Sequence, residues 1–127
     1  ELSRLMLGLK CIFTRLQGIR TVIFDEIDTG VSGAVALAIG KKMQLLSEDI
    51  QVFCVTHLAQ VAAFADIHLL IAKTVRDGRT FTTVNALPQE ERVQELARIM
   101  GGENLTPTVL ASARELILQA KENDNGR

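Results

Sequence analysis

The chain has 127 residues, of which 47% are hydrophobic, and a formal net charge of −1. This length and apolar content suit one domain with a real core, while the nearly neutral charge gives no support to a strongly basic nucleic-acid-binding or membrane-surface domain. Cys11 and Cys54 lie in apolar segments without the spacing of a zinc or redox motif, which predicts buried, reduced thiols in a cytoplasmic protein.

The first predicted element is an amphipathic helix that ends at Gly18. Apolar residues recur at helical spacing from the second residue onward, and basic side chains lie off that stripe. The pattern is already running at the first residue, which is Glu1 rather than Met. We therefore expect an excised or processed piece of a longer protein.

A strand expected at residues 21–26 organises the rest of the chain. Val22, Ile23 and Phe24 form a short apolar run, typical of a central parallel strand that is covered on both faces. Asp25 and Glu26 end this run, where the carboxyl ends of parallel strands form the ligand crevice of open α/β sheets. Such a pair suits Mg²⁺ and an attacking water. The alternative is a strand that runs into a solvated acidic turn.

A turn and a second helix lead to a second strand. Ser32 is the candidate cap of a helix that runs to about Leu46. Residues 51–56 are a continuously apolar strand. The strand–helix–strand order predicts a βαβ unit with parallel pairing and a right-handed crossover.

His57 stands where the second strand ends. Because parallel strands share their carboxyl edge, it is expected at the same edge as Asp25 and Glu26. A lone histidine is more often structural, but beside an acid pair it becomes a candidate ligand contact.

Residues 68–75 and 81–87 are predicted to form an antiparallel hairpin at a sheet edge, because the intervening Asp77-Gly78 is a strong turn signal. Arg76 and Arg79 at its tip are candidates for contact with a phosphate backbone, although solvated turn charges are the commoner case.

Two helices complete the predicted domain. One begins at Pro88, ends at Gly101-Gly102, and has an inner face made of Val93, Leu96, Ala97 and Met100. The other begins at Thr106-Pro107 in a cap-then-proline arrangement. Residues 121–127 are polar without an apolar anchor and are expected to fray.

In this order the motifs resemble the carboxyl-terminal half of an ABC-type ATPase head. Residues 1–4 match the end of the signature motif, residues 21–26 a Walker B strand, and His57 a switch histidine. Over nearly the whole chain the sequence resembles the RecN family, SMC-like ATPases of bacterial DNA repair. That resemblance rests on Phe-Asp-Glu-Ile-Asp-Thr-Gly-Val-Ser-Gly, Cys-Val-Thr-His-Leu-Ala-Gln-Val-Ala and Val-Gln-Glu-Leu-Ala-Arg-Ile-Met-Gly-Gly. It implies a partial P-loop NTPase fold: an α/β domain with a parallel sheet core, flanking helices and an edge β-hairpin.

The resemblance implies roles for individual residues. Asp25 would associate with Mg²⁺, directly or through water. Glu26 would be the base that activates water, and His57 would sense the terminal phosphate of ATP. Asp28 and Ser32 would belong to the D-loop at a dimer interface, although many relatives carry Asp at the position of Ser32.

The first four residues, Glu1, Leu2, Ser3 and Arg4, would meet the ATP of the opposite subunit in a head-to-head dimer. A helix amino terminus suits that contact, because its unpaired N–H groups attract phosphate. The Ser-Gly-Gly that precedes this segment in the family is absent from the sequence. The Walker A phosphate loop and the glutamine loop are absent too; in the family they lie upstream of a long coiled coil.

We therefore predict that residues 1–127 form one domain, the carboxyl-terminal lobe of an ATPase head that acts in bacterial double-strand break repair and recombination. The resemblance implies ATP and Mg²⁺ as cofactors. It also implies a cytoplasmic protein that associates with the nucleoid and not with a membrane. The implied partners are the Walker A lobe and coiled coil of the same protein, a second head, and DNA.

Two alternatives are open. One is the nucleotide-binding domain of an ABC transporter. The other is a non-catalytic α/β module that binds a partner through its first helix or its hairpin, in which case Asp25, Glu26 and His57 are incidental. The catalytic hypothesis requires these three residues at one edge of the sheet, facing a common opening.

Overall fold

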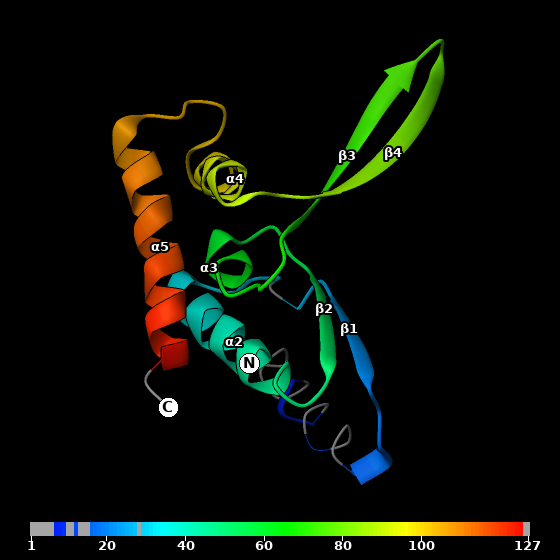
Figure 1. The fold of residues 1–127 in the computed structure, drawn as a ribbon, viewed down its shortest axis with the longest axis vertical. Helices are drawn as coiled ribbons and strands as arrows, with labels where there is room; N and C mark the ends of the chain where they lie inside the picture. Colours follow the sequence, from blue (N-terminus) through cyan, green and yellow to red (C-terminus); the bar gives the residue numbers. More distant parts are fainter. Residues whose placement is uncertain (1–6, 10–11, 13–15, 28, 126–127) are drawn as a thin grey trace.

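The computed structural model describes residues 7–9, 12, 16–27 and 29–125 of the chain, and it has the predicted mixed α/β class (Figure 1). The described residues before Gly18 are helical, as expected, and the remainder of the predicted first helix lies outside the described part. The later elements follow in the order β1 (Thr21–Asp25), α2 (Gly33–Leu46), β2 (Gln51–Val55), α3 (Ala59–Ala62), β3 (Leu69–Arg76), β4 (Arg79–Ala86), α4 (Gln89–Gly101) and α5 (Pro107–Asn125).

The β1–α2–β2 unit is the predicted βαβ unit. β1 and β2 pair in parallel, in a register that runs from Thr21 opposite Gln51 to Asp25 opposite Val55. One face of this sheet packs on α2, and Phe24 at its centre is fully buried. The apolar core on this side consists of Leu7, Phe24, Ala36, Ile39, Met43, Leu46 and Val61.

The second face of the parallel sheet is open. Ile23 is 64% exposed, and Phe53 and Val55 beside it are exposed as well. The expectation that the first strand is covered on both faces is therefore wrong for this chain. Side chains alternate between the two faces of a strand, and within the described residues a helix, α2, covers the face that carries Phe24.

β3 and β4 form the predicted hairpin, with Arg76 opposite Arg79 at its tip. Asp77 and Gly78 both have positive φ, 50° and 70°, as a type I′ turn requires. The predicted edge position is wrong, because β3 and β4 form a two-stranded sheet of their own that projects away from β1 and β2 (Figure 1). The chain leaves β4 into α4, which packs on α3 and α5 and so directs the base of the hairpin toward the helices.

α3, α4 and α5 enclose a second core. As predicted, Val93, Leu96 and Ala97 are buried on the inner face of α4, whereas Met100 is 42% exposed and does not belong to that face. Met100 is the penultimate residue of α4, which ends at Gly101. The other buried members of this core are Ala59, Ala62, Ala63, Phe64, Ala113, Ile117 and Ala120.

The ends of the last two helices follow the expected local chemistry. Gly102 ends α4 with a φ of 73°, and the Val109 amide donates to Thr106 Oγ1 (3.3 Å) at the start of α5. α5 extends to Asn125, so the polar tail is largely helical; its fraying remains a prediction. No helix among the described residues has the length and apolarity needed to cross a bilayer.

Candidate functional site

The carboxyl edge of β1 and β2 carries the polar residues that the sequence analysis singled out. The last pair in the parallel register joins Asp25 to Val55. Glu26 follows Asp25 directly, and His57 lies two residues beyond Val55. All three polar side chains are exposed. The structure thus brings Asp25, Glu26 and His57 to one edge of the sheet, while their chemical roles remain predictions.

Glu26 has an unusual backbone conformation that the sequence did not reveal. Its φ is 56°, in the left-handed region that non-glycine residues rarely adopt. The Thr29 hydroxyl donates to the Glu26 carbonyl oxygen (3.0 Å) and holds the turn in this form. Such strain costs on the order of 1–3 kcal/mol and is often found at functional sites. Sequence patterns carry no signal for it, because glutamate has no preference for this region.

The turn between β1 and α2 contains the remaining predicted contacts. Ser32 takes the N-cap position of α2 in an extended conformation, and its carbonyl oxygen accepts the Ala36 amide (2.8 Å). Its side chain makes no capping hydrogen bond and is exposed. Ser32 therefore occupies the predicted N-cap position, but its side chain does not cap the helix. Asp28 lies outside the described residues, as do Glu1, Leu2, Ser3 and Arg4.

His57 lies in a short loop between β2 and α3. The Leu58 amide donates to Thr56 Oγ1 (3.1 Å), and Leu58 is the N-cap of α3. At the other end of α3, Arg92 of α4 donates through Nη2 to the carbonyl oxygens of Ala62 (3.2 Å) and Ala63 (2.8 Å). The sequence carries no signal for this contact of Arg92, because a charged residue in the first turns of a helix is usually solvated.

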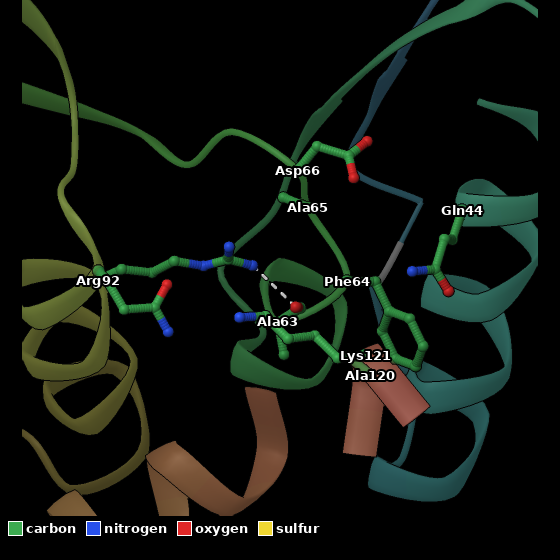
Figure 2. Close-up of a pocket in the computed structure, with 9 residues that line it drawn as sticks. Gln44, Ala63, Phe64, Ala65, Asp66, Arg92, Ala120 and Lys121 are labelled. Carbon is green, nitrogen blue, oxygen red and sulfur yellow. Dashed lines mark hydrogen bonds between the residues drawn. The ribbon is translucent and has the colours of Figure 1, made fainter. Parts of the chain in front are cut away.

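A polar cavity of about 390 Å³ lies at the junction of the helices (Figure 2). Figure 2 shows Arg92 reaching from α4 toward Ala63, with Phe64 and Gln44 across the cavity. The lining residues include neither the acid pair nor His57, so this cavity is not the opening that the catalytic hypothesis requires. Its full lining is Gln44, Ala63, Phe64, Ala65, Asp66, Gln89, Arg92, Ala120 and Lys121.

His68, at the base of the hairpin, is half-buried near Arg92. Burial lowers the pKa of His68 below its ordinary value of 6.5; the positive charge of Arg92 lowers it further, and Glu95 partly opposes this shift. The folded chain therefore binds a proton at His68 less readily than the unfolded chain does.

We expect the free energy of unfolding to fall as the pH drops through 6.5 toward the lower pKa of folded His68, because protonation then favours the unfolded chain. Urea denaturation between about pH 5 and pH 8 measures this slope. His68→Gln should remove the His68 part of it. A slope that is unchanged in His68→Gln would contradict this assignment.

The carboxylates at the carboxyl edge suit a cation whose other ligands come from the phosphates of a bound nucleotide. Among the described residues no group of three or more His, Cys, Asp or Glu side chains could hold a metal ion by itself. Mg²⁺ is commonly bound by one or two carboxylates together with substrate phosphates. Asp25 and Glu26, exposed at the end of β1, fit that mode of binding.

Comparison with known proteins finds sequences that are similar to this chain. No protein-family model matches the chain. The chain is 50% identical over 122 residues to the DNA repair protein RecN of Bacillus subtilis, 46% over 127 residues to RecN of Mycobacterium bovis, and 43% over 120 residues to RecN of Vibrio cholerae. These matches cover 96%, 98% and 94% of the chain. By sequence, the chain is similar to a segment of the RecN proteins.

The chain spans about a fifth of the length of these relatives, 21% in Bacillus subtilis and in Mycobacterium bovis and 22% in Vibrio cholerae. A solved structure from work on ATP-driven dimerization and DNA-stimulated activation of SMC ATPases shares the fold. Its TM-score is 0.56 at 22% identity, over 72% of this chain and 55% of that one. The predicted fold class, a mixed α/β partial P-loop NTPase fold, is thereby confirmed.

Proposed function

We propose that this chain supplies the Walker B and switch-histidine half of an SMC-like ATPase head, which binds and hydrolyses ATP at a head-to-head dimer interface during repair of DNA double-strand breaks in the bacterial cytoplasm. The observation that carries the proposal is the register of β1 and β2. It pairs Asp25 with Val55 and so brings the acid pair and His57 to one sheet edge. The RecN relatives support this function over that of an ABC transporter domain.

In this proposal the three side chains have separate roles at the terminal phosphate of ATP. Asp25, together with the phosphates, would hold Mg²⁺, which would supply positive charge against the charge that develops on the transferred phosphoryl group. Glu26 accepts a proton from the attacking water. His57 donates a hydrogen bond to the terminal phosphate from the end of the neighbouring strand. Alignment of these groups, rather than covalent chemistry, lowers the barrier.

The dimer interface is assigned from the family resemblance. Asp28 and Ser32 would lie at the boundary between the two heads. Glu1, Leu2, Ser3 and Arg4 would face the ATP held mainly by the other head. The exposed Ser32 side chain, whose hydroxyl is not used to cap α2, is compatible with such a contact.

The open face of the parallel sheet supports the proposal that this chain forms half of a larger head. Parallel sheets are normally covered on both faces. Here Ile23, Phe53 and Val55 present exposed apolar side chains on one face. The Walker A lobe of the same protein is the proposed cover, and the coiled coil and DNA are the further partners.

The chain alone should neither bind Mg-ATP tightly nor hydrolyse it. Most of the affinity of such sites comes from a glycine-rich loop and its lysine, and no Gly-x-x-x-x-Gly-Lys-Ser/Thr occurs in this sequence. Without that loop, Asp25 and Glu26 repel the triphosphate. Calorimetric titration tests this, and a dissociation constant of about 1 μM, equivalent to about −8 kcal/mol, would contradict the half-site proposal. A co-folded segment that carries the phosphate loop should restore hydrolysis.

A non-catalytic interaction module is the second candidate, and the projecting hairpin favours it. Ile71, Val75 and Val84 are exposed on the same face of the hairpin. Apolar exposure of this kind is typical of protein-binding surfaces. Under this hypothesis, substitution of Glu26 would not affect the activity of the complete protein.

A further inference from the structure

The short helix that follows His57 depends on contacts from outside itself. α3 has 4 residues, fewer than an isolated helix needs to be stable in water. Its N-cap, Leu58, adjoins His57 and makes no side-chain capping hydrogen bond. Any displacement of α3 therefore passes directly to the loop that carries His57.

Arg92 provides the polar contact at the carboxyl end of α3. Its Nη2 donates to the Ala63 carbonyl oxygen at 2.8 Å (Figure 2) and to the Ala62 carbonyl oxygen at 3.2 Å. These groups lie at the negative end of the helix, where a cation is favoured. At 7% exposure, Arg92 is the only buried charged side chain among the described residues.

The buried guanidinium of Arg92 is incompletely hydrogen-bonded. Its Nε is buried without a hydrogen-bond partner, and burial lowers the pKa of its guanidinium, which Asp66 only partly offsets. Even a fully paired buried charge is weak evidence for a stabilising role, because replacing a buried ion pair by apolar side chains is often neutral or stabilising. A buried arginine with incomplete hydrogen bonding therefore points to a positional role at α3.

We propose that Arg92 is a positioning residue for ATP hydrolysis, which fixes α3 and thereby holds His57 at the carboxyl edge of the sheet. This inference rests on the proposed function. Loss of the Nη2 hydrogen bonds loosens α3 and widens the range of positions open to His57. Catalysis falls because displacement of a reacting group by about 1 Å can cost on the order of 10²-fold in rate.

The test uses the full-length protein with its phosphate loop. Arg92→Met removes the donors but keeps an apolar stem, and it should lower kcat about 10- to 100-fold with little change in KM. Arg92→Lys restores a donor to the same carbonyl oxygens and should recover part of the loss. The matched control is Arg98→Met, on the same helix, which removes an exposed ion pair to Glu95 and should leave kcat unchanged.

A double-mutant cycle with His57→Ala separates positioning from general damage. If Arg92 acts through His57, Arg92→Met added to His57→Ala should change kcat by less than about threefold. Hydrogen exchange should also accelerate at the amides of residues 59–64 in Arg92→Met. Multiplicative losses in the double variant, or unchanged exchange there, would overturn the inference.

The two proposals fail in different ways. If Glu26→Gln and His57→Ala both leave turnover unchanged, the proposed function is wrong at this site. If both lower turnover and Arg92→Met does not, only the positioning role is wrong. Should Arg92→Met fail to fold, Arg92→Lys decides the matter, because a normal kcat with faster exchange at residues 59–64 would contradict coupling to His57.

Discussion

Glu26→Gln in the full-length protein should leave nucleotide binding nearly intact and reduce ATP hydrolysis by about 10²- to 10⁴-fold, the usual contribution of a general base. Glutamine preserves the size of the side chain but cannot accept the proton of the attacking water. Mg²⁺ and phosphate contacts formed by other residues should persist, so ATP-bound dimers should accumulate.

Steady-state ATPase assays and nucleotide-dependent dimerisation measure this effect. Glu91→Gln is the matched control, because Glu91 is an exposed acid on α4, away from the carboxyl edge. Turnover of Glu26→Gln within about threefold of wild type would remove Glu26 from the catalytic site and favour the interaction-module hypothesis.

The backbone at Glu26 adds a second expectation. Glycine adopts a φ of 56° without the steric cost borne by other residues. Glu26→Gly should therefore be no less stable than wild type, and more stable by up to about 1 kcal/mol if the released strain exceeds the added chain entropy. Its ATPase activity should be lost as in Glu26→Gln. Denaturation of the two variants compares these outcomes.

Gly40→Ala should lower the free energy of unfolding by about 1–3 kcal/mol, the usual cost of overpacking a core. A Cβ atom at Gly40 would lie 2.4 Å from Phe64 Cδ2 and 2.9 Å from Cε2. Both residues are buried, so the aromatic ring cannot move away without disturbing the second core. This close contact is where α2 meets the segment that follows α3.

Gly33→Ala provides the matched control on the same helix. A Cβ atom at Gly33 would meet only Gln60 Nε2, at 3.8 Å, which is ordinary van der Waals contact. That substitution should be neutral or stabilising by up to about 1 kcal/mol, because alanine favours the helix. Urea denaturation compares the variants, and Phe64→Leu should relieve part of the Gly40→Ala penalty. Equal effects at the two glycines would contradict the packing argument.

The strands, the helices and the carboxyl edge of the sheet were determined by local sequence. Alternation and apolar runs predict β1 and β2, and their order with α2 predicts parallel pairing. That pairing alone places the acid pair and His57 at the same edge. Likewise Asp77-Gly78 determines the hairpin turn and Thr106-Pro107 the start of α5, because turns and caps depend on a few neighbouring residues.

Only the tertiary structure decided which segments meet across long sequence separations. Arg92 bonds to carbonyl oxygens 29 and 30 residues away, and Gly40 packs against Phe64, contacts that no local period encodes. The strained φ of Glu26 depends on how the turn after β1 closes. The hairpin was predicted at the edge of the parallel sheet, but it forms a separate two-stranded sheet that leads into α4. α4 packs on α3 and α5, and these contacts between segments far apart in the sequence fix where the base of the hairpin lies.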